Sequence, residues 1–191
     1  MQYFTLKILG LTRRYPITHI SKNTRLVNVS ILGDIELVNK LADYWAQKLT
    51  KISFDYLVCP EVKVVPLVHG VALRSGHKRF VVCRKSVKPY MVNPVILKPL
   101  PHFPKHIKQL VINGADANLL TGKKVIIMDD VISTGVTIRM MKKLMEKVEA
   151  RVVKLIAVFK QGQQFDEIEN LFYLTELPIF KDNCTTNSHL S

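Results

Sequence analysis

The middle of the chain alternates between continuous apolar runs and segments in which apolar residues recur at helical spacing. The runs predict buried strands at residues 54–59, 79–83, 125–128 and 152–159. The helical spacing predicts helices over residues 66–74 and 136–149, and a further helix from an Asp34 N-cap to Leu49. Strands and helices that alternate in this way are typical of an α/β fold with a mostly parallel central sheet and helices on both faces.

The segments on either side of this region have a different pattern. Residues 1–32 predict short strands and turns, residues 107–112 predict one more strand, and residues 119–124 predict a turn. Five of the nine prolines fall between residues 89 and 104, which argues against helix there and predicts a long mobile loop or edge strands. At 191 residues the whole chain is predicted to form one domain.

Composition narrows the class of protein. No apolar run approaches the roughly 20 residues that cross a bilayer, and the N-terminus lacks the pattern of a signal peptide. Cys59, Cys83 and Cys184 are widely spaced and form no C-x-x-C motif, so we expect thiols and a cytoplasmic location.

The net charge of +13 favours polyanionic partners. A solvated basic face with one anion site explains this charge more simply than a nucleic-acid surface, which stays open.

The segment from Val125 to Ile138 carries the strongest chemical signal. Asp129 and Asp130 follow an apolar strand, and a hydroxyl-rich turn then opens a helix. Two carboxylates offer acceptors for the donors of a vicinal diol, and the first turn of a helix offers free N–H groups to an anion. The anion would lie on the turn, whose residues are Ser133, Thr134, Gly135, Val136 and Thr137. The segment therefore predicts a binding site for a sugar phosphate.

Charged residues also follow two other predicted strands. Arg84 and Lys85 come directly after residues 79–83, and Lys88 and Tyr90 lie in the proline-rich stretch beyond them. Glu61 and Lys63 follow residues 54–59. Ligands of parallel α/β sheets bind at the carboxyl ends of the strands, so these groups are predicted to converge with Asp129 and Asp130.

The segment from Val125 to Ile138 closely resembles the phosphoribosyl pyrophosphate (PRPP) motif of type I phosphoribosyltransferases, and the adenine-type members are most similar. The resemblance implies that Asp129 and Asp130 bind the ribose hydroxyls and that the 133–137 turn binds the 5′-phosphate. It implies that Arg84, Lys85 and Lys88 act on the pyrophosphate, that the Glu61–Lys63 loop faces it, and that Tyr90 helps to cover the site. Val136 stands where the family commonly has a second glycine.

The resemblance also implies an architecture and a reaction. A core of about residues 34–160 would carry a small hood from about residues 1–32 and 161–181. PRPP and a purine base would give a nucleoside monophosphate and pyrophosphate, with Mg²⁺ as cofactor, held through PRPP near the two aspartates without a direct protein ligand set. A homodimer is expected.

The acceptor base is less constrained than the donor. Hypoxanthine-guanine members usually place an aspartate at the position of Ser133, so its absence favours adenine. Xanthine and orotate enzymes stay open as alternatives, although Arg84 and Lys85 favour a purine. A second class of function also stays open, in which the same fold senses PRPP and binds nucleic acid through its basic surface.

Overall fold

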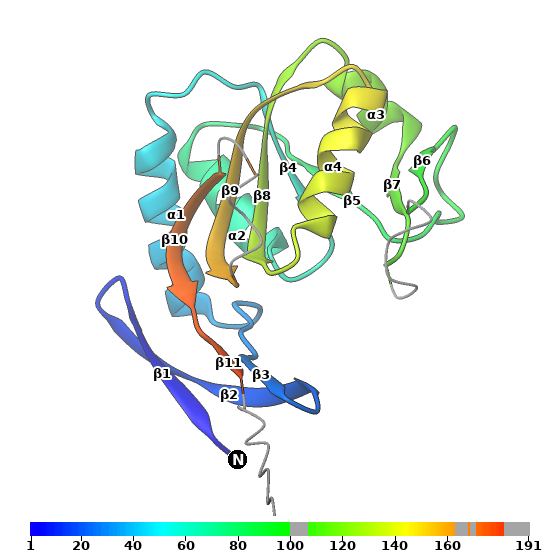
Figure 1. Ribbon diagram of the computed structural model, residues 1–191. Coiled ribbons are helices and arrows are strands. Elements are labelled where there is room, and N and C mark those ends of the chain that lie inside the picture. Colours follow the sequence, from blue (N-terminus) through cyan, green and yellow to red (C-terminus); the bar gives the residue numbers. More distant parts are fainter. Residues whose placement is uncertain (100–106, 163–167, 169–170, 182–191) are drawn as a thin grey trace, which may run out of the picture.

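The chain is built around a five-stranded parallel sheet in a computed structural model that describes residues 1–99, 107–162, 168 and 171–181 (Figure 1). The strands follow the order β10-β9-β8-β4-β5, and each neighbouring pair is parallel. Their bounds are Tyr56–Pro60 for β4, Val81–Cys83 for β5, Lys124–Ile132 for β8, Arg151–Gln161 for β9 and Leu171–Leu177 for β10. The predicted α/β class is confirmed.

Helices cover both faces of this sheet, as predicted. Helices α1 (Ile35–Leu49) and α2 (Val65–Arg74) lie on one face, and α3 (Gly114–Leu120) and α4 (Val136–Lys147) lie on the other (Figure 1). Side chains of β8 alternate between the two cores: Ile126 packs in the α1–α2 cluster and Ile127 in the α3–α4 cluster. A strand buried on both faces needs apolar residues at every position, which explains its continuous apolar run.

The terminal segments form a second, antiparallel sheet beyond the carboxyl ends of the core strands (Figure 1). Its order is β1-β2-β3-β11, with bounds Tyr3–Ile8, Leu11–Ser21, Thr24–Val27 and Ile179–Lys181. The buried amide of Gln161, at the end of β9, donates to the carbonyl of Val27 at 3.0 Å and links the two sheets. Residues 171–177, which the prediction places in the hood, instead form β10 at the edge of the core sheet.

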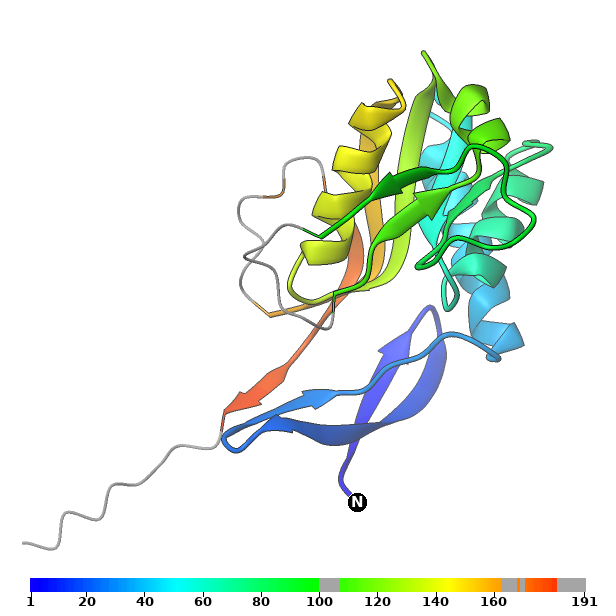
Figure 2. The same ribbon diagram turned by 90° about the vertical axis from the view of Figure 1, so that its right-hand side faces the viewer.

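The proline-rich stretch contains an edge strand of the kind predicted. Strand β6 (Val95–Leu97) pairs antiparallel with β7 (Leu110–Ile112), and this hairpin stands beside the core sheet in Figure 2. Two backbone hydrogen bonds of 2.8 Å join Arg84 to Val111 and connect the hairpin to the end of β5. Part of the predicted loop is therefore a strand that pairs with β7. Residues 100–106 and Cys184 lie outside the described part of the chain.

Among the described residues, no helix is both long and apolar enough to cross a membrane. The predicted strands and helices of the core occur within a few residues of their expected bounds. The exception is α3, where the expected turn at residues 119–124 is preceded by a short helix from Gly114.

An ion pair joins the terminal sheet to the first core helix. The predicted N-cap is confirmed, because a carboxylate oxygen of Asp34 accepts from the backbone N–H of Leu37 at 3.1 Å. Arg13, on β2, donates to both oxygens of the same carboxylate at 2.6 and 3.1 Å, and to Glu36 at 2.8 Å. The hydrogen bond from Arg13 is the main cause that lowers the pKa of Asp34, against a smaller opposing effect of burial.

We expect Asp34→Ala to lower the free energy of unfolding by about 1–2 kcal/mol, because it removes a helix cap and the partner of Arg13. Asp34→Asn keeps an acceptor for Leu37 and should lose about half as much. Because the pKa of Asp34 is lower in the folded protein than in the unfolded chain, its carboxylate stabilises the fold at a pH above the unfolded pKa. This contribution is lost as the pH falls through the folded pKa. Urea unfolding at neutral and acidic pH measures both effects, and equal losses in the two variants would contradict the role of the cap.

Candidate active site

Three neighbouring strands bring the predicted site residues to one edge of the sheet. Strands β8, β4 and β5 are adjacent and parallel, so their carboxyl ends face the same side. Asp129 and Asp130 lie on β8, Glu61 follows β4, and Arg84 follows β5. Parallel pairing therefore assembles groups that are far apart in the sequence, as the alternation of strands and helices predicts.

The two aspartates are buried side by side. Each is only 7% exposed, and the N–H of Asp130 donates to Oδ1 of Asp129 at 2.8 Å. Both acids lie inside β8, which continues to Ile132, whereas the prediction ends the strand at residue 128. Burial first, and then the charge of Asp130, hold the pKa of Asp129 well above its usual range, although Lys85 opposes the shift. This pair therefore favours a ligand that brings donors or positive charge.

The turn after β8 has the geometry of an anion site. Gly135 adopts a left-handed conformation with φ of 69° and precedes α4 as its N-cap residue. The side chains of Ser133, Thr134 and Thr137 are exposed, and the turn lines a cavity of about 30 Å³ together with Asp129. Free N–H groups at the first turn of α4 and hydroxyl donors thus face the same small space.

Val136 fits this turn without strain. The positive φ falls on Gly135, and Val136 is the first residue of α4, with its side chain packed in the α3–α4 core. The second glycine that the family commonly has here is not needed for the backbone conformation, because a β-branched residue resists only a positive φ.

Glu61 connects the ends of β4 and β5. One carboxylate oxygen accepts from the backbone N–H of Lys85 at 2.9 Å and the other from the guanidinium of Arg84 at 3.3 Å. Burial alone would raise the pKa of Glu61, but these two donors and the charge of Lys88 together lower it. The peptide bond between Glu61 and Val62 is cis. Glu61 therefore positions Arg84 and Lys85 at the edge of the sheet.

The remaining predicted residues lie further out. The ammonium of Lys88 donates to the hydroxyl of Ser86 at 2.8 Å, and its charge reaches Glu61. Lys63 is exposed just after β4, and Tyr90 is 64% exposed. The structure thus places Lys88 near Arg84 and Lys85. The roles of all these residues, and those of Lys63 and Tyr90, stay predictions.

One part of the terminal sheet borders the site although the sequence pattern does not predict it there. Gly162, with φ of 98°, follows β9, and a Cβ atom there would lie 3.0 Å from the side chain of Ile179 and 4.0 Å from the carbonyl of Ser133. Strand β11 therefore comes close to the turn at residues 133–137. The only sequence signal is a glycine directly after an apolar strand, which indicates a close approach of backbone.

A metal ion at this site would need ligands from outside the protein. Among the described residues, no group of three or more His, Cys, Asp or Glu side chains could hold one. One oxygen of Asp130 is buried and has no hydrogen-bond partner in the described part of the chain. An acceptor of this kind fits a hard cation whose other ligands come from a substrate, as Mg²⁺ at phosphate-binding sites requires.

The fold and the site define a class of enzyme that binds a sugar phosphate at the carboxyl edge of an α/β sheet. Residues 29–186 match the phosphoribosyl transferase domain family. The chain is 32% identical to an adenine phosphoribosyltransferase of Thermosipho africanus over 80% of each chain. It is 28% identical to a hypoxanthine/guanine phosphoribosyltransferase of Methanothermococcus okinawensis, over 86% of this chain and 84% of that protein.

Solved structures show the same fold. The adenine phosphoribosyltransferase of Leishmania donovani superposes with a TM-score of 0.66 at 18% identity, over 80% of this chain and 70% of that one. The enzyme of Thermoanaerobacter pseudethanolicus superposes with a TM-score of 0.60 at 23% identity, over 75% and 82%. The chain belongs to the phosphoribosyltransferase family, within its purine-type members, and is a pentosyltransferase.

The raised pKa of Asp129 leads to a prediction about stability. Folding favours the protonated carboxyl group, so its ionisation destabilises the fold at neutral pH, and stability returns as the pH falls through the raised pKa. We expect Asp129→Asn to have a larger free energy of unfolding than the unsubstituted protein at neutral pH. The difference should vanish near the usual aspartate pKa of about 4.

Urea unfolding at several pH values measures this difference. Asp43→Asn is the matched control, because it makes the same chemical change at an exposed aspartate that pairs with Arg74. A lower stability of Asp129→Asn at neutral pH would contradict the interpretation that buried charge destabilises the site.

Proposed function

We propose that this protein is an adenine phosphoribosyltransferase, which converts PRPP and adenine to adenosine monophosphate and pyrophosphate. The observation that carries the proposal is the buried aspartate pair of β8, followed by an anion-binding turn and flanked by the cations after β5. Together these groups match the three parts of PRPP, which are a ribose diol, a 5′-phosphate and a pyrophosphate.

Each group has a role in this proposal. Asp129 and Asp130 accept hydrogen bonds from the ribose hydroxyls, and the turn at residues 133–137 binds the 5′-phosphate. Arg84, Lys85 and Lys88 neutralise the charge that grows on pyrophosphate as the ribose C1 bond to it breaks. The base nitrogen forms the new bond to C1, and the loop that begins at Arg84 excludes water from that carbon.

Asp130, with Asp129 beside it, would hold Mg²⁺ together with oxygens of PRPP and water, and the cation would neutralise part of the pyrophosphate charge. The oxygen of Asp130 that has no hydrogen-bond partner among the described residues supports this arrangement. The buried pair also gains from it, since positive charge nearby favours the ionised form of Asp129.

Adenine is proposed as the base for two reasons. The relative at 32% identity is an adenine enzyme, and Ser133 stands where hypoxanthine-guanine enzymes usually carry an aspartate. Relatives named hypoxanthine/guanine phosphoribosyltransferase are 26–28% identical, so hypoxanthine and guanine are the competing acceptors.

A base panel tests the proposal. Purified protein with PRPP and Mg²⁺ is assayed for pyrophosphate release with adenine, hypoxanthine, guanine, xanthine and orotate, and we expect adenine to give the highest kcat/KM. A preference for hypoxanthine or guanine would overturn the choice of base alone. Release with none of the purines would overturn the proposed function.

The aspartate pair can be tested at the level of one residue. We expect Asp130→Asn to lower kcat/KM for PRPP at least about hundredfold, because an amide replaces a charged acceptor where ligand charge is greatest. Asp116→Asn is the control, since Asp116 lies on α3 and its carboxylate pairs with Arg79, which precedes β5. Near-normal turnover of Asp130→Asn, in protein that melts normally, would contradict the assignment.

A further inference from the structure

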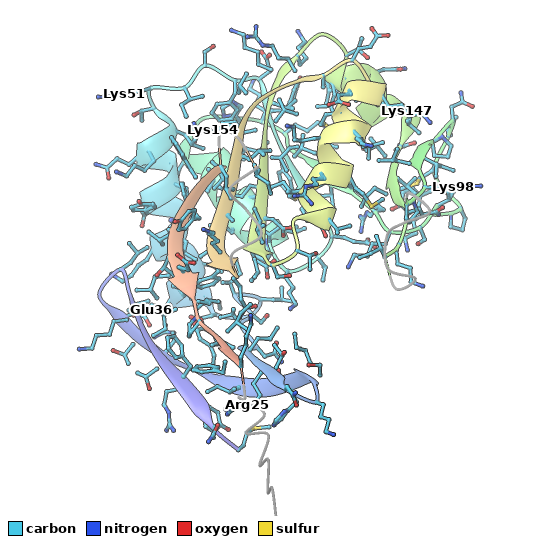
Figure 3. All side chains as sticks on the ribbon, viewed as in Figure 1. Arg25, Glu36, Lys51, Lys98, Lys147 and Lys154 are labelled. Carbon is cyan, nitrogen blue, oxygen red and sulfur yellow. The ribbon has the colours of Figure 1, made fainter. Side chains whose placement is uncertain are left out.

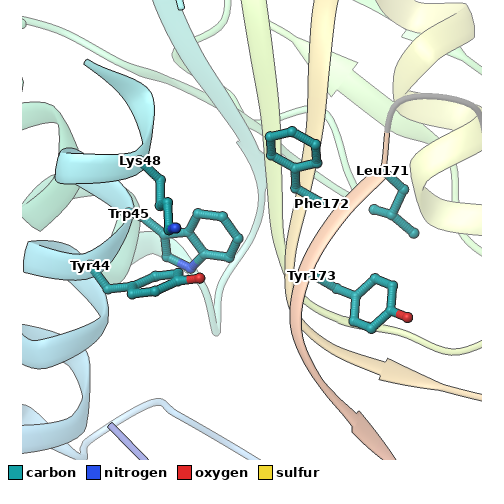
Figure 4. A pocket seen from close by; sticks show the side chains of 6 residues that line it. All are labelled: Tyr44, Trp45, Lys48, Leu171, Phe172 and Tyr173. Carbon is teal, nitrogen blue, oxygen red and sulfur yellow. The ribbon is translucent and has the colours of Figure 1, made fainter. Parts of the chain in front are cut away.

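A second concave surface lies at the β10 edge of the core sheet, two strands away from Asp129 on β8. It is a groove of about 280 Å³ between the second half of α1 and the beginning of β10, and we call it the α1–β10 groove (Figure 4). Its lining residues are Tyr44, Trp45, Lys48, Leu171, Phe172 and Tyr173. The groove lies beside the edge strand β10, whereas the charged groups of the candidate active site lie on β8 and after β4 and β5.

Four aromatic side chains line this groove, and two of them are open to solvent. Phe172 is 44% exposed and Tyr173 is 42% exposed, on a strand at the edge of the core sheet. Tyr44 faces them from α1 (Figure 4). Single exposed rings are common on protein surfaces, but three rings from two elements around one groove indicate a surface that contacts a ligand.

Positive charge accompanies the rings. The ammonium of Lys154 lies 3.4 Å from the centre of the Phe172 ring, and that of Lys48 lies 5.5 Å from the Tyr44 ring. None of the described residues that line the groove is acidic. Figure 3 shows basic side chains on every part of the molecule, but at this groove they stand beside exposed rings.

The wall of the groove also contains an unused hydrogen-bond donor. Trp45 is 2% exposed, and its Nε1–H has no acceptor among the described residues. An indole N–H can only donate, and burying it without a partner costs free energy. A ligand that supplies an oxygen acceptor after a small movement of the neighbouring Tyr44 ring would satisfy it.

We propose that the α1–β10 groove binds a single-stranded segment of nucleic acid. Exposed rings offer stacking surfaces for bases, lysines attract the phosphates, and the Trp45 donor suits a phosphate or base oxygen. The net charge of +13 attracts such a polyanion. The groove is open along an edge strand, which suits an extended chain.

Fluorescence anisotropy with a labelled oligo(U) strand tests this proposal on the full-length protein. We expect the protein to bind the strand with an affinity that falls steeply as the salt concentration rises. We expect Phe172→Ala to lower that affinity about tenfold. Phe172→Leu keeps the apolar volume but removes the ring, so it should bind the strand as weakly as Phe172→Ala. This variant provides the test if Phe172→Ala does not fold. The same oligonucleotide as a duplex should bind less well, because its bases are already stacked.

Matched controls separate the groove from general charge and from the candidate active site. Lys48→Glu should weaken binding much more than Lys143→Glu, which changes the net charge equally on the exposed side of α4. Tyr3→Ala removes an exposed ring from the terminal sheet and should leave binding unchanged. Excess adenosine monophosphate should not displace the strand, and all of these variants should keep purine transferase activity.

Several results would overturn the proposal. These are no binding at low salt, equal weakening by Lys48→Glu and Lys143→Glu, unchanged binding by both Phe172 variants, or displacement by adenosine monophosphate. A change of oligomeric state in Phe172→Leu, measured by sedimentation, would instead assign the groove to a second copy. The proposed transferase function does not depend on any of these outcomes.

Discussion

Two carboxylates placed next to each other inside a buried strand are the constraint on which the candidate site depends. Asp129 and Asp130 are almost fully buried, and the pKa of Asp129 is raised by burial and by its neighbour. Burying the ionised pair destabilises the fold, and the apolar cores on both faces of β8 must offset this loss. A ligand with hydroxyl donors and an associated cation stabilises the ionised pair. The destabilisation that it relieves therefore contributes to the free energy of binding.

The neighbouring strand ends complete this electrostatic arrangement. Glu61 accepts hydrogen bonds from the guanidinium of Arg84 and from the backbone N–H of Lys85. Both cations are therefore held at the same sheet edge, and the ammonium group of Lys85 is not used in this contact. The site thus keeps its carboxylate acceptors on β8 and its cations after β5. This arrangement fits the proposed ligand PRPP, whose ribose diol needs acceptors and whose pyrophosphate needs cations.

The sequence predicted the parts of this structure whose signals are local. Apolar runs and helical spacing predicted the core elements, and the Asp34 cap and the turn around Gly135 followed from simple backbone chemistry. Helix α3 was not predicted, because it is short and its Gly114 is selected by packing: a Cβ atom there would lie 2.5 Å from the carbonyl of Val92. Residues 171–177 were placed in the hood by the resemblance, whereas they form β10 of the core sheet. The exposed rings of this edge strand leave it without the continuous apolar run that predicted its neighbours.

The course of the chain after β9 connects the two sheets and explains why the terminal sheet sits over the active-site edge. Strand β10 belongs to the core, and after Leu177 the chain enters β11, which pairs with β3. At the other end, Arg13 is joined to Asp34 at the start of α1, and Gln161 binds the backbone of Val27. The terminal sheet is therefore held at several points around the carboxyl edge. Because its backbone is already positioned by the core, a ligand that contacts this cover would lose little entropy in ordering it.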